Sequence, residues 1–229
     1  MKTIGLLGGM SWESSLEYYR ILNEEVKKQM GGSHSAKCVM FSFDFQKIED
    51  LQHKGEWNKL TEEMVEQSMN LKKAGADFIV ICTNTMHIMA SEIEKKTGLK
   101  VLHIAEATGK EIKKQGLNKV ALFGTKYTME GSFYKEILEK NFGVEIIIPD
   151  ELDREVIHQV IYKELICGIH RKESKEQYID IIKKMESKGA EGVILGCTEI
   201  PQLIKQSDVS IPVFDTTRIH AMSAVEFAL

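Results

Sequence analysis

The chain has 229 residues, of which 43% are apolar and 28% are charged, an ordinary composition for a globular protein with a sizeable core. Its formal net charge of −4 offers no basic stripe, so we expect no nucleic-acid partner. The apolar run at residues 3–9 is too short for a signal peptide or a membrane span. We therefore expect no membrane partner and a cytoplasmic location.

Apolar, β-branched runs alternate with amphipathic helical patterns, which predicts an α/β protein with mostly parallel sheets. The first helix is expected to begin near Ser14, because Ser14 and Glu17 fit a capping box. The expected strands lie at 3–7, 37–43, 78–82, 100–104, 119–123, 144–148, 192–196 and 212–214. Further helices are expected at 57–74, 86–97, 130–140, 151–166 and 172–188.

Glycines at 5, 8 and 9 accompany the first predicted strand and superficially suggest a dinucleotide-binding loop. The spacing is not that of the G-x-G-x-x-G motif, and Gly5 lies inside the strand rather than in the turn after it. We interpret Gly8 and Gly9 as a tight turn between strand and helix, and no nucleotide is expected.

Four cysteines are far apart in the chain and form no CxxC pair: Cys38, Cys82, Cys167 and Cys197. This spacing predicts neither a disulfide framework nor a zinc site, and no metal is expected. Cys197 comes at the end of a predicted strand, where backbone dipoles at a following helix give a thiol thiolate character. Spacing alone favours this chemical role and a simple packing role equally.

An internal repeat relates the two halves of the chain. Residues 74–81 resemble 188–195 at an offset of 114 residues. Residues 4–9 resemble 120–125 at an offset of 116, and 101–102 resemble 213–214 at an offset of 112. Three similarities in one order predict two related α/β halves, with ligands at the carboxyl ends of the strands in a cleft between the halves.

The repeat also separates two neighbouring candidates for a functional side chain. At the offset of 114, Thr83 aligns with Cys197, and Cys82 aligns with Gly196. Adjacent residues of a strand point to opposite faces, so a regular strand does not present both Cys82 and Thr83 to one side. Cys82 is expected to be structural; a bulge that turns it inward is the alternative. His87 and His103 are interpreted as structural hydrogen-bonding residues.

Three motifs of the chain resemble the aspartate/glutamate racemase family. They are Gly-Leu-Leu-Gly-Gly-Met-Ser-Trp at 5–12, Cys-Thr-Asn-Thr-Met-His at 82–87 and Gly-Cys-Thr-Glu-Ile at 196–200. Their order is that of the family, and the resemblance covers essentially the whole chain. It implies two pseudo-symmetric, three-layer α/β domains with the active site in the interdomain cleft. Residues 1–100 plus 212–229 would form the first domain, and 101–211 the second.

The resemblance also implies an enzyme that needs no pyridoxal phosphate, metal or other cofactor, binds a small amino-acid substrate and forms a homodimer. In the family, one cysteine from each domain faces the substrate Cα. Cys197 matches the second of these cysteines, whereas Thr83 stands at the position of the first, which is a departure. Substrate contacts are implied for the following residues: Met10, Gln52, Asn84, Thr85, Thr125, Thr128, Lys163, Thr198 and Glu199.

A threonine hydroxyl is far less acidic than a thiol and is a poor base. We therefore expect Cys197 to remove the Cα proton from one enantiomer of aspartate or glutamate, and Thr83 or a water it holds to protonate the other face. One enantiomer should be the favoured substrate. Two alternatives stay open: a one-cysteine decarboxylase or isomerase of the same superfamily, as in the arylmalonate decarboxylases, and a non-catalytic binding protein for a dicarboxylate or an amino acid.

Overall fold

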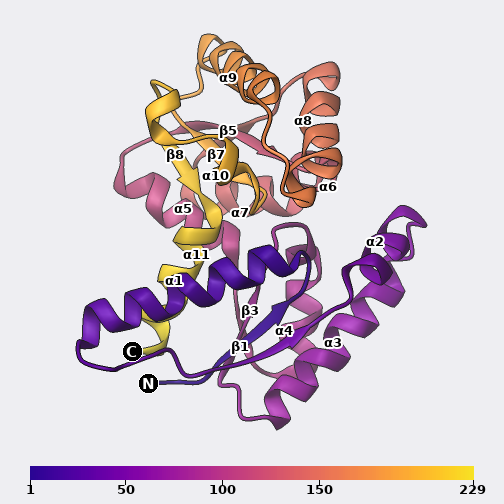
Figure 1. The fold of residues 1–229 in the computed structure, drawn as a ribbon, viewed down its shortest axis with the longest axis vertical. Helices are drawn as coiled ribbons and strands as arrows, with labels where there is room; N and C mark the ends of the chain where they lie inside the picture. The colour runs from indigo at the N-terminus through magenta and orange to yellow at the C-terminus, as the bar shows by residue number, and fades with distance from the viewer. The chain divides into compact units, whose positions relative to one another are not determined.

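The computed structural model describes residues 1–229, which divide into two compact units. Unit 1 comprises Met1–His103 and His220–Leu229, and unit 2 comprises Ile104–Ile219. Each unit contains a four-stranded parallel sheet with helices on its faces (Figure 1). No helix combines the length and the apolar character needed to span a bilayer.

In unit 1 the strand order is β2-β1-β3-β4. The strands are β1 (Ile4–Gly8), β2 (Cys38–Ser42), β3 (Phe78–Ile81) and β4 (Lys100–Leu102). The two central strands are buried along their whole length, as expected when helices cover both faces of a parallel sheet. The helices are α1 (Trp12–Met30), α2 (Phe45–His53), α3 (Trp57–Lys73), the 3-10 helix η1 (Thr85–Met89), α4 (Ala90–Thr97) and most of α11 (Thr216–Ala228).

Two apolar clusters cover the faces of this sheet. Ile4, Leu6 and Val80 pack with residues of α1 and α11, and Leu7 and Ile81 pack on the other face with residues of α3 and α4. This alternation follows from the pleat of the strands, whose successive side chains point to opposite faces. The two ends of the chain also meet in unit 1, where the Lys2 N–H donates to the Ala228 carbonyl at 2.8 Å.

In unit 2 the strand order is β6-β5-β7-β8, the same arrangement as in unit 1. The strands are β5 (Lys119–Gly124), β6 (Glu145–Ile147), β7 (Val193–Gly196) and β8 (Val213–Asp215). The helices are α5 (Ile104–Lys114), α6 (Lys126–Glu130), α7 (Ser132–Phe142), α8 (Glu151–Lys163), η2 (Leu165–Cys167), α9 (Lys172–Ser187), α10 (Ile200–Leu203) and η3 (Gln206–Asp208). The matching strand orders agree with the internal repeat.

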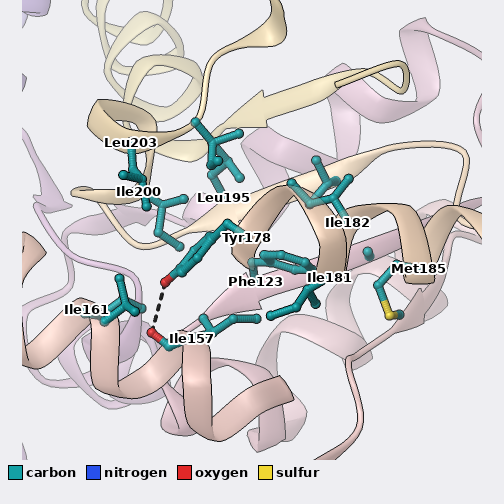
Figure 2. Packing of buried hydrophobic residues seen from close by; sticks show 14 of the residues in the cluster. Phe123, Ile157, Ile161, Tyr178, Ile181, Ile182, Met185, Leu195, Ile200 and Leu203 are labelled. Atoms are coloured by element: carbon teal, nitrogen blue, oxygen red, sulfur yellow. Dashed lines mark hydrogen bonds between the residues drawn. The ribbon is translucent and has the colours of Figure 1, made fainter. Parts of the chain in front are cut away.

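The larger apolar cluster of unit 2 lies between the sheet and helices α8, α9 and α10. Figure 2 shows the Tyr178 ring of α9 among aliphatic side chains, close to Phe123 of β5. The Tyr178 hydroxyl donates to the Ile157 carbonyl of α8 at 2.9 Å, so its one polar atom is satisfied inside the core. The opposite face of the sheet is covered by apolar residues of α5 and α7.

All eight predicted strands are present, but the helices differ from the prediction in two respects. The first helix begins at Trp12 rather than near Ser14. Ser11 caps it, accepting a hydrogen bond from the Ser14 N–H at 3.4 Å, because Gly9 turns the chain sharply with φ +83° directly after β1. No range was predicted for helices α2, α5, α6, α10 and α11. The faces of α11 carry alanines, Ala221 among them, rather than a clear amphipathic stripe.

The expected domain boundaries are also displaced. Residues 101–103 belong to unit 1, because Val101 in β4 pairs with Ile79 in the first sheet. Residues 212–219 belong to unit 2, because Val213 in β8 pairs with Val193 in the second sheet. The strands at 101–102 and 213–214 are thus equivalent edge strands, each in the sheet of its own half.

Candidate active site

The strand registers of the two sheets give Thr83 and Cys197 the same place in their units. Leu7 of β1 pairs with Ile81 of β3, and Phe123 of β5 pairs with Leu195 of β7. Thr83 follows Ile81 by two residues, as Cys197 follows Leu195. Both residues therefore lie just past the carboxyl end of a central strand, where α/β proteins bind ligands.

Cys82 and Thr83 differ in the way the repeat predicts. Cys82 is fully buried among apolar side chains of β1, β3, α1 and α11. Burial raises the pKa of its thiol far above the ordinary value. Thr83 is partly exposed. Thr83, rather than the buried Cys82, is therefore the accessible residue at this strand end, and no bulge brings Cys82 into its place.

The loop after β3 leads directly into η1. Asn84 and Thr85 are almost completely buried here, at 2% and 7% exposure. The His87 side chain bonds back to the start of this loop, with Nδ1 2.8 Å from the Thr83 carbonyl oxygen. The expected carboxylate-binding pair therefore lies in a tightly held turn rather than in an open loop.

Cys197 is hydrogen-bonded to a carboxylate. Its Sγ donates to Glu199 Oε2 at 3.0 Å, and the Thr198 hydroxyl donates to the same oxygen at 2.7 Å. Burial and then the Glu199 charge raise the pKa of the Cys197 thiol well above its usual range. Backbone N–H groups of Thr198 and Glu199 act in the opposite direction, but more weakly. These effects favour the protonated thiol in the protein without substrate, with the Glu199 carboxylate within hydrogen-bonding distance of the sulfur.

Two paired glycines bring the neighbouring strands of unit 2 close together beside Cys197. Gly124 at the end of β5 pairs with Gly196 at the end of β7. A Cβ added to Gly196 would lie only 2.8 Å from the Phe123 carbonyl oxygen. Thr125, which follows Gly124, caps α6 by accepting a hydrogen bond from the Thr128 N–H at 3.3 Å. The loops that carry Thr125 and Cys197 are thus adjacent.

The other expected substrate contacts lie in different environments. Met10 is 4% exposed and packs in an apolar cluster of unit 1, so its side chain serves the core. Thr128 is fully buried. Gln52 is buried on α2, and Lys163 is exposed as the last residue of α8. Neither of the last two lies in the strand-end loops that carry the remaining candidates.

Sequence reasoning missed that three imidazoles pack together in unit 1. The ring of His87 lies 4.8 Å from that of His103 and 5.3 Å from that of His220, measured between centroids. Tyr18 of α1 bonds to His220 Nδ1 at 2.8 Å. The sequence separation between His87 and His220 gave no signal of this contact. No group of His, Cys, Asp and Glu side chains in the chain is arranged to hold a metal ion.

Comparison with known proteins gives one consistent result. Residues 7–224 match the family described as Asp/Glu/Hydantoin racemase. The broad specificity amino-acid racemase RacX of Bacillus subtilis (strain 168) is 25% identical over 231 residues, which cover 97% of this chain and 96% of that protein. A structure of a candidate Asp/Glu racemase from Yersinia pestis is 50% identical, with a TM-score of 0.94 and coverage of 100% and 99% of the two chains. An aspartate racemase homologue from Pyrococcus horikoshii OT3 is 35% identical, with a TM-score of 0.84 and the same coverage.

Proposed function

Because the chain belongs to the Asp/Glu/Hydantoin racemase family, we propose that it inverts the Cα configuration of aspartate, glutamate or both, without a cofactor. The proposal assigns Cys197 to one face of Cα and Thr83 to the other. The observation that carries it is the equivalence of these two residues in the two sheets, each two positions past a paired strand residue.

The choice of substrate is supported by the names of the relatives. The Yersinia pestis and Pyrococcus horikoshii structures are named for acidic amino acids, and they are 50% and 35% identical to this chain. The Bacillus subtilis relative is named for broad specificity, at 25% identity. Acidic substrates are therefore our first choice, and the assay should include neutral amino acids in both configurations.

Glu199 gives the Cys197 side a route for protons. In the proposed step, Glu199 accepts the thiol proton along the 3.0 Å hydrogen bond, and the thiolate then removes the Cα proton of the enantiomer that faces it. A carboxylate two residues away keeps the thiol protonated until substrate arrives, yet offers a base at hydrogen-bonding distance. Backbone N–H groups of Thr198 and Glu199, which favour the thiolate, stabilise the charge once it forms on sulfur.

The Thr83 side works differently, because a hydroxyl does not readily remove a Cα proton. Thr83, or a water it holds, delivers a proton to the carbanion from the opposite face. The proton on Glu199 then returns to the Thr83 side through solvent, which restores both groups. Asn84, Thr85 and Thr125 are assigned to the substrate carboxylates, where hydrogen-bond donors lower the energy of the developing charge.

The different roles of Cys197 and Thr83 predict that the two enantiomers differ in deuterium exchange at Cα. The two enantiomers have equal free energy, so kcat/KM for inversion is the same in both directions. The asymmetry instead appears in exchange without inversion. The Thr83 side must act as the base in the reverse direction, but only the Cys197 side has a carboxylate hydrogen-bonded to its catalytic group, through which a removed proton is replaced from solvent before it returns to Cα. One enantiomer should take up deuterium from deuterated water with its configuration retained, and the other should take it up mainly with inversion.

The test is to incubate each enantiomer of aspartate and glutamate in deuterated water, and to measure deuterium and configuration at Cα together. Cys197→Ala should abolish both signals. Equal retention exchange from both enantiomers, or activity that survives Cys197→Ala, would overturn the proposal. Carbon dioxide release from a malonate without Cα exchange would indicate the one-cysteine decarboxylase instead, and binding without exchange a non-catalytic binder.

A further inference from the structure

Three histidines whose rings pack together in unit 1 have no part in the proposed chemistry. His87 lies in η1, His103 follows β4, and His220 lies in α11. His87 and His220 are 2% and 0% exposed, respectively. Burial lowers the pKa of all three; neighbouring imidazoles add to this for His87 and His220, and the Lys100 charge adds to it for His103, so the rings are neutral near pH 7. A neutral imidazole has one donor and one acceptor nitrogen. A nitrogen that faces a carbonyl oxygen must be the donor, because the oxygen can only accept.

His220 is satisfied at both nitrogens. Its Nε2 lies 2.8 Å from the Leu102 carbonyl oxygen, which can only accept, so Nε2 carries the hydrogen. Its Nδ1 therefore accepts from the Tyr18 hydroxyl, also at 2.8 Å. These bonds join β4, α1 and α11, and they serve the packing of unit 1.

His87 is bonded differently. Its Nδ1 lies 2.8 Å from the Thr83 carbonyl oxygen, so the hydrogen must be on Nδ1. Its Nε2 is then an acceptor, and this atom is buried without a hydrogen-bond partner. A buried polar atom left unsatisfied is costly, so the ring is held in this orientation at the expense of its second nitrogen. The bond that fixes the ring ends on Thr83.

From this geometry, and on the basis of the proposed function, we infer that His87 is a positioning residue for the proton donor Thr83. The His87 side chain fixes the Thr83 carbonyl at the point where β3 has ended and α4 has not begun. Fixing the backbone there fixes the direction of the Thr83 hydroxyl, and with it the path to the face of Cα opposite Cys197. Small displacements of a catalytic group cost large factors in rate, so this bond matters more than its packing role.

Two substitutions at His87 separate the hydrogen bond from the volume of the ring. His87→Asn keeps a donor close to the position of Nδ1, whereas His87→Leu keeps most of the volume and loses the donor. His220→Leu is the matched control, because His220 is equally buried in the same cluster but bonds to Leu102 and Tyr18. All variants are compared in the deuterium assay, with kcat and KM measured for inversion and with retention exchange measured separately.

We expect His87→Leu to lower kcat for inversion by about 10-fold to 100-fold, with KM and the Cys197-dependent retention exchange within about twofold of wild type. His87→Asn should restore inversion to within about threefold. His220→Leu should lower the unfolding temperature but leave the ratio of inversion to retention exchange unchanged. A ¹⁵N spectrum of histidine-labelled protein should find the hydrogen of His87 on Nδ1.

Each contrary result has one meaning. Inversion at the wild-type ratio in His87→Leu would show that the residue only packs, and would overturn the inference while leaving the proposed function intact. A folded His87→Asn variant as slow as His87→Leu, or a His87 hydrogen on Nε2, would overturn the role of the bond. A wild-type protein without any Cα exchange would refute the proposed function and the positioning role with it.

Discussion

The Glu199 carboxylate adds to the effect of burial in raising the pKa of the Cys197 thiol. It accepts hydrogen bonds from the Cys197 thiol and the Thr198 hydroxyl on one oxygen atom, and its charge opposes the formation of a second negative charge on sulfur. Chemical reactivity at this cysteine should therefore be low in the protein without substrate, because the thiolate is the nucleophilic form.

Glu199→Gln should lower the pKa of Cys197, because it removes the neighbouring charge. We expect the rate of Cys197 alkylation by iodoacetamide at pH 8 to rise about threefold to tenfold, as the larger thiolate fraction outweighs its weaker nucleophilicity. Peptide-resolved mass spectrometry measures this rate, and the exposed Cys167 in the same digest serves as the internal control. An unchanged Cys197 rate would show that the carboxylate does not control the thiol.

Cys82→Ala should change stability and not chemistry. The substitution leaves a small void in the fully buried core of unit 1 and should lower the unfolding free energy by about 1 kcal/mol. Urea denaturation measures this loss, and Cα deuterium exchange should stay within twofold of wild type. A folded variant without exchange would move the second catalytic position from Thr83 to Cys82.

At the residue scale the sequence predicted positions better than contacts. The repeat register identified Thr83 and Cys197 as equivalents and separated Cys82 from Thr83, because strand alternation is local and regular. The bond from Cys197 to Glu199 depends on the path of a short irregular loop, which residue types do not determine. An acidic residue two places after a strand-end cysteine was nevertheless a signal, and it was interpreted only as a substrate contact.

At the scale of elements, the close approach of β5 and β7 controls where Cys197 lies. The carbonyl of Phe123, the Leu122 side chain and the Thr128 methyl leave no room for a side chain at Gly196. The two strand ends can therefore lie side by side only with glycine at this position. The paired glycines also fix the position of Cys197, because it directly follows Gly196.

Gly196→Ala should force β5 and β7 apart and lower the unfolding free energy by about 1–3 kcal/mol, with Cα exchange falling along with it. Gly124→Ala should act similarly, because its Cβ would lie 2.8 Å from the Gly196 carbonyl oxygen. The double variant should lose less than the sum of the two, since one separation relieves both contacts. Thermal denaturation of all three would refute this coupling if the losses were simply additive.

Helices and strands were predicted correctly where a pattern in their own residues defines them, and were missed or misplaced where distant contacts do. All eight strands were found because buried β-branched runs flanked by turns are unambiguous in this chain. Helix α11 was missed because Ala221, Ala224 and Val225 make a small, apolar face whose periodicity is weak. The placement of β8 was wrong because a strand's sheet is decided by its long-range partner, here Val193, rather than by its own residues.

At the scale of the whole molecule, the two units should respond differently to acid. The pKa of His220 is lowered by burial from 6.5 to about 4, and His87 and His103 of the same unit are also shifted down. The unfolded chain binds these protons first, so the stability of unit 1 is complete above pH 6.5 and declines as the pH falls towards 4. His220 alone accounts for about 3 kcal/mol of this decline.

Fluorescence can follow this loss in unit 1 by itself, because the only two tryptophans, Trp12 and Trp57, both belong to it. Thermal melts at decreasing pH should show the tryptophan transition moving to lower temperature between pH 6.5 and 4. His220→Asn should flatten this dependence, whereas replacement of the exposed His34 should not. A transition that stays constant over this range would contradict the prediction.

The hydrogen bond between Lys2 and Ala228 holds the two ends of the chain next to each other. Joining these ends and cutting the chain elsewhere would therefore change the order of the segments along the chain without changing their contacts. A short peptide linker between these residues, with new ends opened in the exposed stretch at 32–35, should give a circular permutant with the same circular dichroism spectrum and the same Cα exchange. In that permutant the segment from β2 to β4 would precede unit 2, and α11, β1 and α1 would follow unit 2 as one continuous stretch. Such a result would show that the fold does not depend on where the chain begins and ends.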